Sequence, residues 1–173
     1  MSNYWTTPRD PERQNRIWTD GSSGMKSGWC GWAYHGFVQG KTVVACGYER
    51  GTNQRAELRA IVEALRAVPA GERLEIISDS EYAIFSLTKY REKWEKNGFK
   101  SATAEPIKHV DLVKAGIAIV DRLDVKFTHV RGHTGERGNE LADILSKSAR
   151  YVAEGRGPLI DVRGFLSCDP FVV

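Results

Sequence analysis

Cysteine is scarce in this sequence, and no two cysteines lie close together. The 173 residues contain three of them, Cys30, Cys46 and Cys168. Without a C-x-x-C pair, the chain lacks the pattern of a zinc knuckle or of a thioredoxin-like redox site. An odd number of widely spaced cysteines favours a reducing interior over a disulfide-forming environment, so we expect a cytoplasmic protein.

Long apolar runs and an excess of one charge are also absent. No segment approaches the roughly 18 apolar residues of a membrane span, so we expect no membrane partner. Residues 1–16 are polar and include Pro8 and Pro11, so we do not expect a secretory signal peptide. The 25 basic and 22 acidic side chains leave a net charge of +3. This near balance excludes a highly basic coat protein and an acidic, disordered chain.

The composition that is present is that of a folded domain. Hydrophobic residues make up 41% and charged residues 27% of the chain, which is a usual globular mixture. A chain of this length can bury a core of its own without disulfides or a structural metal. We expect a flexible N-terminal tail at 1–15, one domain at 16–153 and a C-terminal extension at 154–173.

The order of apolar patterns predicts an α/β fold. Three strand candidates come first, which suggests an antiparallel meander, and strands then alternate with helices, which suggests parallel pairing. Leu58, Ile61, Val62 and Leu65 form one helical stripe. A mixed sheet with helices packed on it satisfies this order. We expect strands at 17–20, 29–37, 42–48, 74–78 and 125–130, and helices from 53 to before 69, from 81, at 106–123 and at 139–153.

Four acidic residues stand at positions where a functional site could form. Asp20 closes the first predicted strand and Asp79 the fourth. If these strands are parallel neighbours, both carboxylates lie side by side at one sheet edge, which is costly unless a cation joins them. Glu57 continues the buried stripe of the first helix. Asp143 lies at the edge of the last helix's stripe, where periodicity alone does not single it out.

Taken singly, each acid has an ordinary interpretation as a turn residue, a helix cap or part of a solvated helix face. Taken as a set, three or four carboxylates without cysteine ligands favour a hard cation such as Mg²⁺ or Mn²⁺. Such ions often act in pairs in nucleases and polymerases.

Sequence blocks around the four acids carry a resemblance to a known family. They are Thr19-Asp20-Gly21-Ser22, Thr52-Asn53-Gln54-Arg55-Ala56-Glu57-Leu58, Ser78-Asp79-Ser80-Glu81-Tyr82, and Val130-Arg131-Gly132-His133-Thr134-Gly135 followed by Gly138-Asn139-Glu140-Leu141-Ala142-Asp143. In order and spacing, across residues 17–150, they resemble type 1 ribonuclease H, the endonuclease that cleaves the RNA strand of RNA–DNA hybrids. The form is bacterial-like, with a basic handle at 89–114. The resemblance implies a ribonuclease H-like fold, with a five-stranded mixed sheet in the order 3-2-1-4-5.

The resemblance also implies a mechanism and makes 16–153 the catalytic domain. Asp20, Glu57, Asp79 and Asp143 would hold two Mg²⁺ ions, or Mn²⁺ as a substitute, around the scissile phosphate. Water would attack in line and leave a 5′-phosphate and a 3′-hydroxyl. His133 would assist proton transfer or product departure, since an unperturbed imidazole titrates at about pH 6.5. The family expectation for the oligomeric state is a monomer.

Residues that would bind the hybrid follow from the same resemblance. Near the acids they are Gly21, Ser22, Ser23, Thr52, Asn53, Gln54 and Glu81, and in the handle Tyr90, Trp94, Lys96 and Lys108. Two features depart from the family. The segment 24–28 is short and lacks Asn, and Glu81 stands where many relatives have Gln and can accept but not donate hydrogen bonds. For the handle, the alternative is an ordinary solvated helix in which Trp94 covers the core.

Two other functions stay open at this point. One is another nuclease of the same fold group, of the junction resolvase type. Three features count against it: the helix start N-Q-R-A-E-L, the handle and the His133 loop. The other is a hybrid-binding module without chemistry, which the presence of all four acids disfavours.

Overall fold

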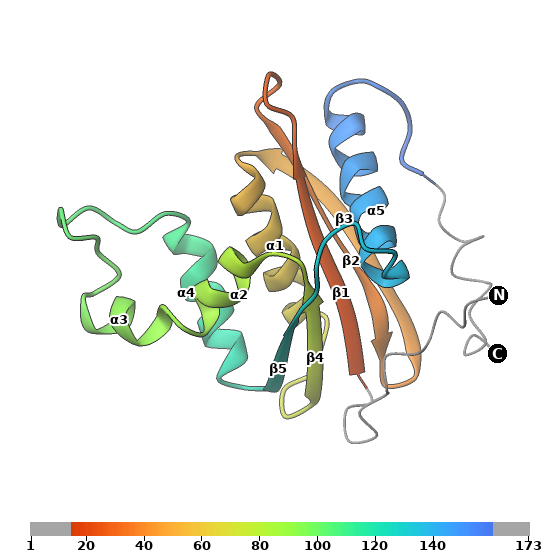
Figure 1. Ribbon diagram of the computed structural model, residues 1–173. Helices are drawn as coiled ribbons and strands as arrows, with labels where there is room; N and C mark the ends of the chain where they lie inside the picture. The colour runs from red at the N-terminus through yellow and green to blue at the C-terminus, as the bar shows by residue number, and fades with distance from the viewer. Residues whose placement is uncertain (1–14, 161–173) are drawn as a thin grey trace.

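The computed structural model describes residues 15–160, and its centre is one mixed sheet. The strands are β1 (Asn15–Ser23), β2 (Trp29–Val38), β3 (Lys41–Arg50), β4 (Arg73–Ser78) and β5 (Asp124–His129). They lie in the order β3-β2-β1-β4-β5 (Figure 1). β1 and β3 run antiparallel to β2, whereas β4 runs parallel to both β1 and β5. The predicted α/β fold and strand order are confirmed.

Helices cover both faces of this sheet (Figure 1). They are α1 (Asn53–Arg66), α2 (Glu81–Leu87), α3 (Arg91–Lys96), α4 (Val110–Val120) and α5 (Arg137–Ala153). The main core lies between the sheet and α1 with α4, and its members include Ile17, Leu58, Ile76 and Val113. A smaller cluster on the other face joins Trp18 to α5. Among residues 15–160, none of these helices has the length and apolar character needed to cross a bilayer.

The first strand extends beyond its predicted end, and it starts earlier. The sequence predicts a strand that ends at residue 20, before Gly21, Ser22 and Ser23, but β1 pairs with β2 as far as Ser23 opposite Cys30. The antiparallel partner supplies backbone bonds where β4 has already ended, so Asp20 lies within a strand and not at its close. Asn15 belongs to β1 and is 2% exposed, so the boundary of the predicted tail is one residue too late.

The helix expected from Pro106 begins four residues later, at Val110. Pro106 instead forms an isolated bridge with Lys100, and the amide of Ile107 donates to the carbonyl of Phe99 at 3.0 Å. These contacts close a loop over residues 99–107, before the helix begins. Figure 1 shows α3 and this loop projecting away from the sheet. The projection corresponds to the segment predicted as a handle.

The ends of the chain lie partly outside the described residues. The predicted flexible tail, apart from Asn15, falls in residues 1–14, and most of the predicted extension falls in residues 161–173. Of the cysteines in the described part, Cys30 and Cys46 are free thiols, and Cys168 lies outside it.

Candidate active site

The end of the β1–β4 pairing brings two of the predicted acids together. The last parallel pair is Thr19 opposite Ser78, so the next residues, Asp20 and Asp79, follow side by side. Glu57 comes from the first turns of α1, which Thr52 caps by accepting the amide of Arg55 at 3.3 Å. A Cβ at Gly21 would clash with the backbone of α1, so glycine there allows the helix to approach the strand.

Asp143 joins this group from α5, on the opposite face of the sheet. The hydroxyl of Ser146, one turn further along α5, lies 3.4 Å from Oδ2 of Asp20. Asp143 itself accepts from Nζ of Lys147 at 2.6 Å. The four acids therefore come from within β1, from α1 and α5, and from the residue after β4.

Electrostatics show that the four carboxylates act on one another. The pKa of Asp20 is raised to about 8, first by burial of its side chain and then by the charge of Asp79, with further contributions from Asp143 and Glu57. The pKa of Glu57 is raised mainly by burial, which a hydrogen bond from Ser80 partly opposes. The site therefore gathers acidic side chains at a buried place, where ionising each carboxyl costs free energy.

Polar side chains of the same region hold two of these acids in place. Asn53 donates from Nδ2 to Oε1 of Glu57, and the hydroxyl of Ser80 donates to Oε2. Asn139, which is 2% exposed, donates from Nδ2 to Oδ2 of Asp79 at 3.0 Å. The carboxylates thus have fixed orientations set by α1, α2 and α5.

The donor set fits a divalent cation. Within residues 15–160, no three acidic, histidine or cysteine side chains are arranged so as to hold a metal ion, and Asp79 and Asp143 accept hydrogen bonds from Asn139 and Lys147. The available ligands are nevertheless all oxygens, and the pKa of Asp20 is raised first by burial and then by the charges of the neighbouring acids, a repulsion that a cation would relieve. These are the ligands that Mg²⁺ and Mn²⁺ prefer.

Several residues at the site carried no role in the sequence interpretation. Asn139 and Ser80 lie within the motif blocks. Their closeness in sequence to Asp143 and Asp79 was the only sign in the sequence that they belong to the site. Lys147 could have been found as a cation one helical turn after Asp143. Gly132 packs so closely that a Cβ there would lie 2.7 Å from Oδ2 of Asp79.

The four histidines occupy different places. His133 is exposed in the loop between β5 and α5, with a left-handed φ of 56°. His129 is exposed, and its Nε2 lies 3.2 Å from the carbonyl oxygen of Asp79 at the site. His35 is structural: it is buried, stacked on Trp18, and burial lowers its pKa to about 4. His109 lies edge-on to Tyr82.

Most of the residues predicted to bind substrate are accessible. Thr52, Asn53 and Gln54 are exposed at the start of α1, and Glu81 is exposed at the start of α2, next to the acids in the chain. Gly21 and Ser22 are buried within β1, and Ser23 is half-buried. The exposed set therefore borders the acidic cluster on the α1 and α2 side.

In the handle, the cations are exposed and the aromatic side chains less so. Lys96 is exposed and pairs with Glu92 at 2.6 Å, and Lys108 is exposed as well. The rings of Tyr90 and Trp94 lie 5.4 Å apart. Trp94 packs against the main core, as the alternative interpretation of this residue holds, and Tyr90 is the more accessible of the two.

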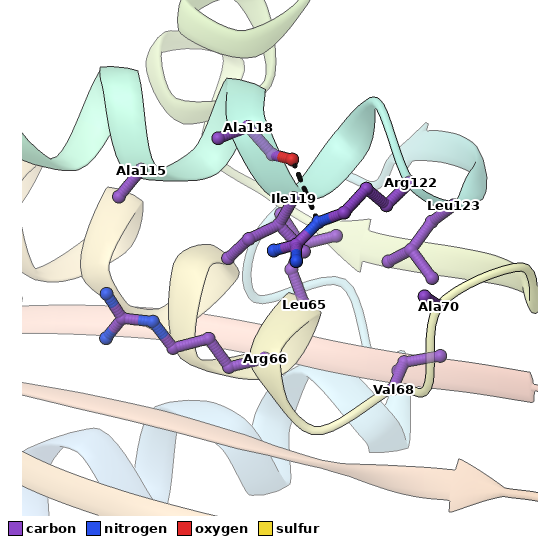
Figure 2. A pocket seen from close by; sticks show the side chains of 9 residues that line it. All are labelled: Leu65, Arg66, Val68, Ala70, Ala115, Ala118, Ile119, Arg122 and Leu123. Atoms are coloured by element: carbon purple, nitrogen blue, oxygen red, sulfur yellow. Dashed lines mark hydrogen bonds between the residues drawn. The ribbon is translucent and has the colours of Figure 1, made fainter.

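A groove elsewhere on the molecule takes no part in this site. It has a volume of about 400 Å³ and lies between the C-terminal ends of α1 and α4, where Figure 2 shows Leu65, Ile119 and the two arginines Arg66 and Arg122. Arg122 donates from Nε to the carbonyl of Ala118 at 3.2 Å. No carboxylate and no predicted site residue lines it.

Comparison with known proteins agrees with the fold and with the motif blocks. The family model described as RNase H matches residues 12–151. A ribonuclease H of Bordetella pertussis (strain Tohama I) is 35% identical over 145 residues, which is 83% of this chain and 94% of that protein. One of Anaeromyxobacter sp. (strain K) is 42% identical over 106 residues, 61% of this chain; the match spans 58% of that relative's length.

A solved structure shows the same fold. It is that of LC9-RNase H1, described as a type 1 RNase H with the type 2 active-site motif, and its TM-score with this chain is 0.68 at 24% identity. The similarity covers 90% of this chain and 81% of that one. The family match over 140 consecutive residues, together with the strand order and the four converging acids, places this chain in the RNase H family.

Proposed function

We propose that this protein is a metal-dependent endonuclease that hydrolyses the RNA strand of RNA–DNA hybrids, leaving 5′-phosphate and 3′-hydroxyl ends. One observation carries the proposal: in a chain of the RNase H family, four acids gather at the end of the β1–β4 pairing, where burial and then the charges of Asp79, Asp143 and Glu57 raise the pKa of Asp20 to about 8. Such a cluster is stable with ionised side chains only when cations join it.

The acids are the proposed metal ligands. Asp20, Glu57, Asp79 and Asp143 would hold two divalent ions, and the RNase H family depends on divalent metals in general. We infer Mg²⁺, with Mn²⁺ as a substitute, because both prefer carboxylate oxygens. When bound, such ions polarise the phosphate and lower the pKa of water.

Other residues of the chain would orient and assist. Asn139 fixes Asp79, and Ser80 with Asn53 fixes Glu57, through the hydrogen bonds described above. His133 stands exposed in a loop beside Gly132, where its imidazole would assist proton transfer or product departure.

Recognition of the hybrid is the second part of the proposal. Exposed polar groups at Thr52, Asn53 and Gln54 would meet the RNA strand, whose 2′-hydroxyl distinguishes it from DNA. Gly21, Ser22, Ser23 and Glu81 would complete that contact. The handle would bind phosphates of the DNA strand through Lys96 and Lys108, with Tyr90 and Trp94 beside them. We further infer that residues 16–153 act as the catalytic domain of a cytoplasmic monomer.

Cleavage of a labelled RNA–DNA hybrid with and without Mg²⁺ or Mn²⁺ tests this function. We expect cleavage of the RNA strand only with metal, and a loss of roughly a hundredfold or more in Asp79→Asn. Asp124→Asn is the matched control, because it removes an acid at the opposite end of the parallel strands. Single-stranded RNA, duplex RNA and four-way junction DNA are assayed in parallel.

The same assay separates the alternatives. Hybrid binding without cleavage under any metal would support a binding module. Preferred cleavage of junction DNA would support a resolvase-type enzyme. Equal activity of Asp79→Asn and the unmodified protein would refute the assignment of the acids.

A further inference from the structure

The turn between β1 and β2 is tied to the end of α5. Ser27, within the turn, donates from its hydroxyl to Oε1 of Glu154, one residue beyond α5, at 2.6 Å. Gly24 at the start of the turn also lies against that carboxylate, since a Cβ there would collide with it. In Figure 1 the tip of this hairpin and the last turn of α5 stand at the same end of the sheet.

Glu154 is itself firmly held. Arg150 donates from Nη1 to its Oε1 at 3.2 Å, and Arg156 donates from Nη1 to its Oε2 at 3.1 Å. The guanidinium groups of both arginines lie over the ring of Tyr151, at 4.7 and 4.1 Å. The side chain of Glu154 is only 10% exposed. The acceptor that Ser27 meets is therefore fixed and charged, which makes the hydrogen bond a strong one.

The opposite side of the turn is held as well. Arg50, the last residue of β3, donates from Nη1 to the carbonyl of Ser27 at 2.6 Å. Its guanidinium lies 4.2 Å from the ring centroid of Trp29. Ser27 is thus bound through its side chain to the end of α5 and through its backbone to the end of β3. The turn therefore links the end of β3, at the edge of the sheet, to the end of α5.

This link bears on the proposed substrate contact because the turn continues directly from Gly21, Ser22 and Ser23. We propose that Glu154 is a positioning residue that fixes the β1–β2 turn, and with it the end of β1, in the conformation that binds the RNA strand. The proposal rests on the proposed function. Glu154 and Arg156 lie after residue 151, the last residue that the family model matches, so the link is formed by the segment that follows the matched domain.

Steady-state kinetics on the hybrid test the role of Glu154. We expect Glu154→Ala to raise KM about fivefold and to change kcat less than about twofold, since binding geometry is lost and the acids are untouched. Glu154→Gln keeps an oxygen acceptor for Ser27 and should restore most of the KM. Glu63→Ala is the matched control, because Glu63 on α1 also pairs with two arginines, Arg59 and Arg66, away from the turn.

Hydrogen–deuterium exchange provides a readout that does not depend on activity. The amides of residues 24–28 should exchange faster in Glu154→Ala than in the unmodified protein or in Glu63→Ala. Unchanged exchange, an unchanged KM, or an equal loss in kcat would each overturn the positioning role. Absence of hybrid cleavage by the unmodified protein would instead refute the proposed function, and the exchange data would still decide whether Glu154 holds the turn.

Discussion

Asn139 at the start of α5 donates from Nδ2 to Oδ2 of Asp79, at the end of β4, over 3.0 Å. The amide is 2% exposed, and its own Oδ1 is a buried atom without a partner among the described residues. A buried oxygen without a hydrogen-bond partner lowers the free energy of unfolding, and the side chain of Asn139 carries this cost at the site. The orientation of Asp79 is therefore set by α5 as well as by its strand.

Replacing Asn139 by Ala should reduce activity more than stability. Loss of an outer partner of a metal-binding carboxylate typically costs about 10- to 100-fold in metal affinity or activity. We expect a loss in this range in hybrid cleavage, measured across a titration with Mg²⁺. Asn15→Ala is the control, because Asn15 is also buried and hydrogen-bonded, at the other end of β1. If both variants lose activity equally after correction for the folded fraction, Asn139 has no special role.

Gly132→Ala should displace Asp79. The new Cβ would lie 2.7 Å from Oδ2 of Asp79, which is closer than side chains tolerate, so the carboxylate or the loop must shift. We expect kcat to fall roughly tenfold or more, because a shift of about 1 Å in a catalytic group can cost a hundredfold. Gly135→Ala strains the same loop, at a φ of 83°, but meets no atom within 4 Å. A larger loss in Gly135→Ala than in Gly132→Ala would contradict this explanation.

Without metal, stability should fall as the pH rises from about 4 to about 8. The pKa of Asp20 is 3.8 in an unperturbed chain and about 8 in the folded protein, so the folded state binds an extra proton between these values. A group that is protonated only in the folded state stabilises it at low pH, and this contribution is lost as the pH passes the folded pKa.

Thermal unfolding in a chelating buffer checks this dependence. The decline between pH 5 and pH 8 should be smaller in Asp20→Asn, which has no proton to lose, and Mg²⁺ should reduce it in the unmodified protein. An identical pH dependence in Asp20→Asn would show that the raised pKa does not govern stability.

Removing two exposed cations from the handle should weaken binding. We expect Lys96→Ala combined with Lys108→Ala to raise KM far more than it lowers kcat, and to reduce the dependence of hybrid binding on salt, because each phosphate contact releases counterions. Lys41→Ala combined with Lys126→Ala removes the same charge outside the handle. Binding measured from 50 to 200 mM salt distinguishes the two pairs. An unchanged KM and salt slope in the handle variant would exclude it as a contact surface.

Local chemistry allowed much of the molecule to be predicted from the sequence. The stripe from Leu58 to Leu65 predicted α1, and the confirmed strand order followed from the resemblance that the blocks around Asp20, Glu57, Asp79 and Asp143 carry. Periodicity succeeds for such elements because a helix or strand must place its apolar side chains on one face.

Other features depend on contacts between residues far apart in the chain. Gly21, Ser22 and Ser23 look like a strand terminator, yet β2 keeps them in the sheet. Pro106 looks like a helix start, yet its bridge to Lys100 delays the helix to Val110. Local propensity is a weak preference, and a partner strand or bridge outweighs it.

The sequence by itself, through the resemblance that its motif blocks carry, predicted the four acids of the proposed site and determined the type of fold. Only the tertiary structure decided what surrounds those acids: the amide of Asn139 on Asp79, the hydroxyl of Ser80 on Glu57, and the bond from Ser27 to Glu154 that joins a turn to the end of α5. The physical reason is that each acid stands in a short motif of neighbouring residues, which is visible in the sequence. The hydrogen bonds join residues 23 to 127 positions apart in the chain, and they form only once the sheet has brought the partners together.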